Sequence, residues 1–241
     1  MKLIEIFDTN LSQTNHPKNT LRASDEWYRK RKPNYDDPDT LSHGSNYVAK
    51  KDADPHVIRK DSTGVHSPID RFKDGLQIYA EAIIMNEAAQ DNPFLPRFYD
   101  YHIDQDEQGN KFYSFKMEKL FASDSKEISK IPFKSFAASI TKDIFRNRKE
   151  KELFLRTFME EVEDAPEVGY NELFTDDIGW YLGEMIDNGN IDVASNELSQ
   201  ALKLIYKLRK EHNLTNDLHG SNLMYRIGPY GVQLVLNDPL A

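Results

Sequence analysis

Three polar side chains near the C-terminus have the types and spacing that phosphate chemistry needs. Asp217 lies in the segment NDLHGSNLMYR, Asn222 follows five residues later, and Asp238 lies in LVLNDPLA. Asn222 and Asp238 offer oxygen atoms that can bind a hard cation such as Mg²⁺, which leaves Asp217 as a free carboxylate. Mg²⁺-assisted phosphoryl transfer uses this arrangement, because the metal neutralises phosphate charge and the carboxylate accepts the proton of an incoming hydroxyl.

The chain must fold back on itself to bring these three side chains together. The segment 222–238, NLMYRIGPYGVQLVLND, is typical of two strands around a Gly-Pro-Tyr-Gly turn, and a helix is predicted just before Asp217. A hairpin places the ends of its two strands side by side, so Asn222 and Asp238 become neighbours with Asp217 close by. Each piece alone also fits an ordinary turn or cap, but the joint pattern favours a site for phosphoryl transfer.

The segments DLHGSN and LVLND are similar to the catalytic and metal-binding loops of the protein-kinase-like superfamily. With His two residues after the Asp, and Asp-Pro in place of Asp-Phe-Gly, they most resemble phage-encoded early serine/threonine kinases. Aminoglycoside and choline kinases share the Asp-Leu-His pattern. The resemblance extends from Leu41 to the C-terminus and is carried mainly by 217–241. It implies that Asp217 is the catalytic base and that Asn222 and Asp238 bind Mg²⁺.

The resemblance also implies groups that hold ATP. Gly44 and Ser45 occupy the position of the phosphate-covering loop, although a full Gly-x-Gly-x-x-Gly pattern is absent. In the helix predicted at 68–89, Glu81 lies beside the apolar face and is the expected partner of a strand cation, whereas Glu87 is interpreted as a solvated residue. The residues expected to border adenine, or to bond it through their backbone, are Met117, Glu118 and Leu120.

Two further positions are expected at the phosphates. His219 falls where protein kinases usually carry a phosphate-contacting Lys, and a protonated imidazole can donate to the γ-phosphate. The strand 55–60 should supply a cation. If Ile58 points to the core, alternation of side chains places Arg59 in the usual Lys position, and Lys60 fits only if the strand bulges. Arg59 in place of Lys is the main departure from the family pattern, since a guanidinium is larger and presents a fork.

Strand patterns dominate up to Leu120, and helical patterns follow it. Strands are predicted near 41–45 and at 45–51, 55–60, 97–104 and 111–120, and helices at 68–89 after an N-cap at Ser67, 133–146, 149–163, 176–187 and 195–211. We therefore expect an α+β, bilobal protein-kinase-like fold, with a small antiparallel sheet and one helix in the first lobe and a helical second lobe ending in a β-hairpin. The expected divisions are an N-terminal extension at 1–40, the sheet lobe at 41–120 and the helical lobe at 121–241.

Composition narrows the functional classes. The 241-residue chain carries a formal net charge of −9, which disfavours general binding to nucleic acid or to an anionic membrane. It contains no cysteine, so disulfides, thiolate zinc sites and cysteine nucleophiles are excluded. The seven histidines show no His-x-x-x-His spacing, which disfavours zinc hydrolysis. Neither a signal peptide nor a membrane-spanning stretch is recognised, and a cytoplasmic location is expected, in the host if the protein is phage-encoded.

These patterns predict an ATP- and Mg²⁺-dependent serine/threonine protein kinase that acts on host proteins and on itself. A small-molecule kinase remains open, because the acidic segments FMEEVEDAPE and FTDDIGWYLGEMIDNGN would suit a cationic acceptor. A pseudokinase also remains open, on the strength of Arg59, the sparse glycines and the missing activation segment, as does nucleotidyl transfer. The sequence ends three residues after Asp238, so either the helical lobe is minimal or the chain is a piece of a longer protein.

Overall fold

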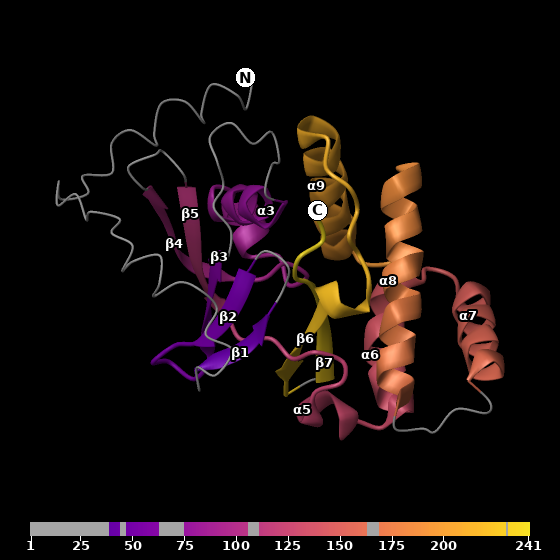
Figure 1. The fold of residues 1–241 in the computed structure, drawn as a ribbon. Helices are drawn as coiled ribbons and strands as arrows, with labels where there is room; N and C mark the ends of the chain where they lie inside the picture. The colour runs from indigo at the N-terminus through magenta and orange to yellow at the C-terminus, as the bar shows by residue number, and fades with distance from the viewer. Residues whose placement is uncertain (1–38, 44–46, 63–74, 106–110, 163–168, 230) are drawn as a thin grey trace.

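The computed structural model describes residues 39–43, 47–62, 75–105, 111–162, 169–229 and 231–241. Its N-terminal half is a five-stranded antiparallel sheet with the order β1-β2-β3-β5-β4 (Figure 1). The strands are β1 (Thr40–His43), β2 (Tyr47–Lys51), β3 (Val57–Ser62), β4 (Phe98–Gln105) and β5 (Lys111–Glu118). Both predicted hairpins form, because β2 pairs with β3 and β4 pairs with β5 in antiparallel register.

A single longer helix, α3 (Gly75–Ile84), accompanies the sheet. It buries the side chains of Leu76, Tyr79 and Ile83, whose spacing places them on one face. The predicted helix at 68–89 is therefore too long at its C-terminal end. The chain leaves helical geometry at Asn86, whose side chain accepts a hydrogen bond from the backbone of Ala88 and caps a separate short helix, α4 (Glu87–Gln90). Ser67 and Pro68 lie outside the described residues.

The second half of the chain is helical. Its helices are α5 (Lys126–Ser129), α6 (Phe133–Ile144), α7 (Arg148–Glu161), α8 (Tyr170–Asn188) and α9 (Asn196–His212). The last helix, predicted from Ser195, begins at Asn196, and Ser195 is its N-cap, since Ser195 Oγ accepts the backbone N–H of Leu198 at 3.2 Å. Helix α8 begins earlier than predicted and ends at Gly189, which adopts a left-handed φ of 69°. The short helix α5 was not predicted.

The terminal hairpin of β6 (Leu223–Gly228) and β7 (Gly231–Leu236) lies between the sheet and the long helices (Figure 1). On the helical side, Tyr225 is fully buried, its ring lies 5.0 Å from that of Phe136, and its hydroxyl lies 2.6 Å from Thr175 Oγ1. On the sheet side, the backbones of Phe121 and Tyr225 exchange hydrogen bonds of 2.9 and 2.8 Å. Both halves therefore hold the hairpin.

Helix α3 and the loop before β4 fix the far end of the hairpin. The buried Tyr79 hydroxyl donates to Leu236 O at 2.6 Å, and Leu236 N donates to Phe94 O at 2.8 Å. Burial raises the pKa of Tyr79, and the negative charge of Asp238 raises it further, so the hydroxyl remains a donor. These contacts set the position from which the chain continues into Asp238.

The α+β class, the N-terminal antiparallel sheet and the helical part with its terminal hairpin are confirmed. One cluster of buried side chains runs through both halves, from Phe115 and Met117 under the sheet to Phe174 and Leu202 among the helices. Among the described residues, no helix is long and apolar enough to cross a membrane. The predicted N-terminal extension lies almost wholly outside the described residues.

Candidate active site

The loop that carries Asp217 is held between two long helices and the hairpin. Helix α9 ends at His212, and Asn213 reverses the chain with a left-handed φ of 55°. A 3₁₀ turn at Gly220–Asn222 then leads into β6. The backbone of Gly220 lies close to α8, because a Cβ there would lie 1.8 Å from Asp176 Oδ1 and would require the Asp176 side chain to move. The loop is therefore packed tightly against α8.

Asp217 and Asn222 are joined directly. Asn222 Nδ2 donates to the backbone carbonyl of Asp217 at 2.8 Å and to its Oδ2 at 2.9 Å. These bonds fix the carboxylate of Asp217, whose side chain remains 41% exposed and so accessible to a second molecule. Because the amide nitrogen of Asn222 is used in this way, its oxygen is the atom left for a cation. The five-residue spacing seen in the sequence thus corresponds to a physical contact.

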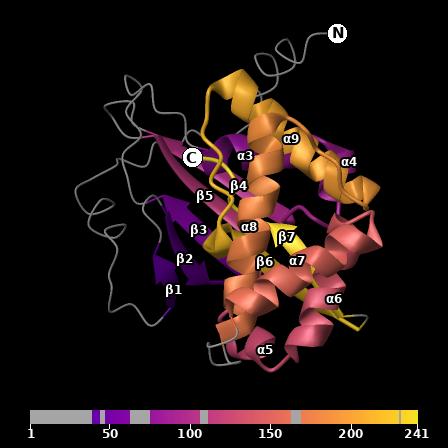
Figure 2. The ribbon, with the colours of Figure 1, turned by 90° about the vertical axis from the view of Figure 1, so that its right-hand side faces the viewer.

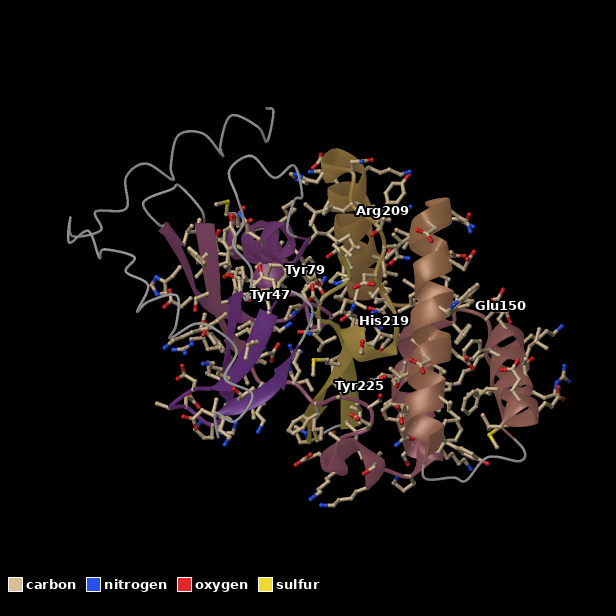
Figure 3. The ribbon with its side chains drawn as sticks, in the orientation of Figure 1. Tyr47, Tyr79, Glu150, Arg209, His219 and Tyr225 are labelled. Carbon is tan, nitrogen blue, oxygen red and sulfur yellow. The ribbon has the colours of Figure 1, made fainter. Side chains whose placement is uncertain are left out.

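His219 lies on the same loop, beside α8 (Figure 3). Its Nε2 lies 3.1 Å from Asn222 Nδ2 and 3.4 Å from Asp217 Oδ1, and its Nδ1 lies 2.8 Å from Ser221 Oγ. The imidazole therefore contacts three polar side chains of the loop, those of Asp217, Ser221 and Asn222, and is itself 54% exposed. Its predicted role at the γ-phosphate stays a prediction.

The chain after β7 runs back along the loop. Thr215 N donates to Ala241 O at 2.7 Å, Ala241 N donates to Thr215 O at 3.1 Å, and Asp217 N donates to Pro239 O at 2.9 Å. Asn237 N donates to Asn222 O at 2.9 Å. Asp238 therefore lies between Asn237, which bonds to Asn222, and Pro239, which bonds to Asp217. Backbone hydrogen bonds hold the three predicted side chains in one small region, as the hairpin pattern predicted.

Lys60 brings the sheet to this region. Its Nζ lies 3.7 Å from Asp238 Oδ2, and the side chains of Lys60 and Asp238 are 13% and 26% exposed. An ammonium group at this position is a point charge that can contact either a carboxylate or a phosphate. The sheet and the hairpin therefore meet at one charged pair.

The predicted placement of Arg59 is wrong. Its Nε lies 3.1 Å from Asp61 Oδ2 on the same strand, and its side chain is 44% exposed. Lys60 shares a face of β3 with Ile58, which packs against the core. The prediction assumed that the face of β3 that packs against the core is opposite to the face that meets Asp238. In the structure Ile58 and Lys60 lie on the same face, so Lys60 reaches Asp238 without a bulge in the strand.

Glu81 lies in α3 but is engaged away from Lys60. Its Oε1 accepts hydrogen bonds from Tyr101 Oη at 2.5 Å and from Gln77 Nε2 at 2.9 Å. Burial and this contact raise the pKa of Tyr101. The expected pair between a strand cation and Glu81 is not seen, because Lys60 contacts Asp238, Arg59 contacts Asp61 and Glu81 contacts Tyr101.

The three predicted hinge residues lie where β5 leaves the sheet. Met117 is fully buried opposite Ile58 and Phe98 of the neighbouring strands, and Leu120 is also buried. Glu118 N donates to Arg97 O at 2.9 Å. Gly44 and Ser45, predicted at the phosphates, lie outside the described residues.

The side chain of Glu118 makes a contact that the sequence did not suggest. It forms a two-point ion pair with Arg226 of β6, in which Arg226 Nε lies 2.8 Å from Oε2 and Arg226 Nη2 contacts Oε1. Arg226 Nη1 also donates to Pro93 O at 2.9 Å. An arginine inside an apolar strand is a signal for a buried partner, but the partner lies 108 residues away.

The oxygen atoms of Asn222 and Asp238 suit a cation whose other ligands are phosphate and water. Among the described residues, no group of three or more His, Asp or Glu side chains could hold a metal ion. Mg²⁺ in phosphate chemistry needs only one or two protein oxygens, because phosphates and waters complete its shell. The oxygen of Asn222 and the carboxylate of Asp238 meet that requirement. No protein-family model matches this chain, and no curated protein sequence matches it.

Proposed function

We propose that this protein is an ATP- and Mg²⁺-dependent phosphotransferase, of the serine/threonine protein kinase type. One observation supports the proposal most strongly. Asn222 Nδ2 donates to the carbonyl and to Oδ2 of Asp217 at 2.8 and 2.9 Å, and Lys60 Nζ of the sheet lies 3.7 Å from Asp238 Oδ2. In this proposal Asp217 is the base, Asn222 and Asp238 are the cation ligands, and the ammonium group of Lys60 contacts phosphate, all at the junction of sheet and hairpin.

In this proposal each side chain has one task. Asp217 accepts the proton of the acceptor hydroxyl while the oxygen of that hydroxyl bonds to the γ-phosphorus. The bond between the γ-phosphorus and the oxygen that bridges it to the β-phosphate breaks, and ADP is released. Asn222 and Asp238 would hold Mg²⁺, which when bound would neutralise charge at the phosphates. Lys60 exchanges Asp238 for a phosphate oxygen when nucleotide binds, and His219 lies beside the reacting groups.

The expected nucleotide position follows from the same frame. Adenine lies at the segment of Met117, and its edge is bonded by backbone groups of Leu120 and Glu118 other than the Glu118 N–H, which donates to Arg97 O. Gly44 and Ser45 cover the phosphates. In this arrangement the sheet supplies one lobe of a bilobal kinase fold, and the helices with the hairpin supply the other.

The acceptor is proposed to be a hydroxyl on a protein, including this chain itself and, if the chain is phage-encoded, proteins of the host. The test is the intact mass of purified protein after incubation with ATP and Mg²⁺, beside the Asp217→Asn and Asp238→Ala variants. We expect a gain of one or more phosphoryl groups in the unaltered protein and none in either variant. A gain of the same size in Asp217→Asn would remove the base assignment, and an AMP-sized gain would assign nucleotidyl transfer instead.

A pseudokinase is the second candidate, and a specific observation favours it. Lys60 contacts Asp238 and Glu81 contacts Tyr101, whereas an assembled kinase site pairs the strand lysine with the helix glutamate. If this arrangement persisted with nucleotide bound, Asp238 would be neutralised by Lys60 and would hold Mg²⁺ weakly. Nucleotide binding without any mass gain, on this chain or on added protein acceptors, would select this candidate.

A further inference from the structure

A recess lies on the helical part, between α7 and α8. Helix α7 lies outside α8 at the edge of the helical part and crosses it at an angle (Figures 1 and 2). The hollow between them has a volume of about 300 Å³, which is within the range of pockets that take ligands or side chains of a partner. No role in the proposed phosphoryl transfer uses it.

The floor of this α7–α8 groove is aromatic. Phe158 is buried, and the rings of Phe154 and Tyr181 meet at 5.7 Å in an edge-to-face arrangement. Trp180 also lines the groove and is 72% exposed, the most exposed of the large apolar side chains described. A tryptophan that remains exposed beside a hollow is typical of a surface that a partner covers.

The groove also carries carboxylates. Glu161 of α7 and Asp177 and Glu184 of α8 all line it. Burial raises the pKa of Asp177, and the charges of Glu161 and Asp176 raise it further, which is the environment of an anion that lacks a cation beside it. Among the described residues, no Lys or Arg forms an ion pair with these three carboxylates.

None of the four basic residues of α7 (Arg148, Lys149, Lys151 and Arg156) lines the groove, and the two arginines are paired along their own helix. Arg148 pairs with Glu152 and Arg156 pairs with Glu160 along the same helix, at 2.6 and 3.8 Å. Helical periodicity places Arg148 and Arg156 away from the face that carries Phe158 and the groove. The groove is therefore an apolar floor with a negative rim, and its chemical complement is a cationic segment that also presents apolar surface.

The groove is connected to the candidate active site through one helix. The backbone of Gly179 in α8 lies against the loop, since a Cβ there would be 3.1 Å from His219 Cα. The groove residues Trp180 and Glu184 lie on the far side of the same helix, because helical periodicity turns them by about 100° or more from Gly179. A segment bound in the groove would therefore be held one helix width from Asp217.

We infer that the α7–α8 groove docks a basic segment of the protein substrate, with Arg or Lys side chains at the carboxylates and over Trp180. This inference rests on the proposed kinase function and names the class of substrate. Arg and Lys bind both carboxylates and the face of an indole, so one side chain can satisfy both features of the groove.

The test measures binding without nucleotide, so that it does not depend on catalysis. The chain contains two tryptophans, and in a Trp27→Phe background only Trp180 reports. The probe is a blocked peptide of alternating arginine and leucine, compared with a peptide in which glutamine replaces arginine. We expect the arginine peptide to change Trp180 fluorescence saturably and the glutamine peptide to bind at least roughly tenfold more weakly.

Two matched sets of variants localise the binding by calorimetry. Neutralising the groove with Glu161→Gln, Asp177→Asn and Glu184→Gln should weaken the arginine peptide about tenfold, as expected for three partly exposed charge contacts. The control set changes net charge equally at the exposed residues Glu127→Gln, Glu172→Gln and Glu211→Gln, and should change affinity less than about twofold. Equal weakening by both sets would overturn the inference, because it would show attraction to overall charge alone.

The remaining outcomes separate this inference from the proposed function. Groove-dependent peptide binding without any phosphoryl gain would keep the docking site and reject the kinase. A phosphoryl gain on the protein with no peptide binding would reject the docking site alone. Binding of spermine as tight as that of the peptide would also reject it, because the groove would then take small polycations rather than a protein segment.

Discussion

The two sides of the candidate active site are built differently. On the hairpin side, Asp217, Asn222 and Asp238 are fixed largely by backbone hydrogen bonds, such as Asp217 N to Pro239 O at 2.9 Å and Asn237 N to Asn222 O at 2.9 Å. On the sheet side, Lys60 reaches the site only through the end of a long side chain, and its one described contact there is with Asp238 at 3.7 Å.

This difference indicates which part of the site exists before a ligand arrives. Side chains held by backbone hydrogen bonds keep their positions, whereas a lysine with four rotatable carbons can change partner. We therefore expect the cation and proton-accepting groups to be preorganised and the phosphate-contacting group to adjust on binding. The Glu118–Arg226 pair and the Tyr79–Leu236 bond are among the contacts that hold the two sides at a fixed separation.

Removing the charged link between the sides should have the largest effect. Arg226→Ala leaves the buried carboxylate of Glu118 without its partner, so we expect a loss of about 3 kcal/mol in the free energy of unfolding. The measurement is denaturant unfolding, with Arg148→Ala as control, because Arg148 is 89% exposed and its surface pair with Glu152 should leave stability nearly unchanged. Equal losses in both variants would show that Glu118–Arg226 is no structural link.

The sheet side itself is tested at the neighbouring positions Lys60 and Arg59. Lys60→Ala should weaken MgATP binding at least roughly tenfold, because a charge-assisted contact to phosphate is lost. Arg59→Ala should change the affinity less than about twofold, since Arg59 is engaged with Asp61. Calorimetric titration of MgATP measures both, and the opposite ranking would restore the register that places Arg59 at the site.

The hydrogen bond from α3 to β7 should have a smaller effect on stability. Tyr79→Phe removes the donor to Leu236 O and leaves a buried carbonyl without a partner, so we expect a loss of about 1.5 kcal/mol in the free energy of unfolding. Tyr99→Phe is the control, because Tyr99 is 56% exposed and should change stability by less than about 0.5 kcal/mol. A Tyr79→Phe protein as stable as the unaltered one would remove this contact from the account.

Removing the charge of Asp177, which lies on neither side of the site, should have the smallest effect and should raise the free energy of unfolding rather than lower it. The pKa of Asp177 is raised by burial and by its acidic neighbours, so the folded state disfavours its charged form at neutral pH. Asp177→Asn should therefore raise stability at neutral pH, by roughly 0.5 kcal/mol or less after solvent screening. The gain should disappear on acidification below about pH 4, where the unfolded chain is also protonated. Thermal unfolding across this pH range measures it, and a gain independent of pH would contradict the electrostatic cause.

The sequence predicted the hairpin side well, because local patterns determine it. The pairing of Gly228 with Gly231 sets the register of β6 with β7, and this register brings Asn222 beside the segment of Asp238. The helix before the loop also carried its own N-cap at Ser195. The roles of Asp217, His219, Asn222 and Asp238 remain predictions, since position alone does not demonstrate chemistry.

The sheet side could not be predicted to the same depth, because long-range packing decides it. Alternation in β3 separates Arg59 from Lys60 but does not say which face meets the hairpin, and the prediction chose the wrong one. The break between α3 and α4 depends on Asn86 acting as a cap in the middle of a helical pattern. Glu118 and Arg226 are paired across 108 residues, a separation at which no local pattern operates.

The central claim is that the hairpin side binds a nucleotide through Mg²⁺, and calorimetric titration of ATP tests it most directly. ATP is titrated with and without Mg²⁺ into the unaltered protein and into Asp238→Ala. The account predicts that Mg²⁺ tightens ATP binding strongly in the unaltered protein and has little effect in the variant. ATP binding that is equal with and without Mg²⁺, or a Mg²⁺ effect that survives in Asp238→Ala, would contradict it.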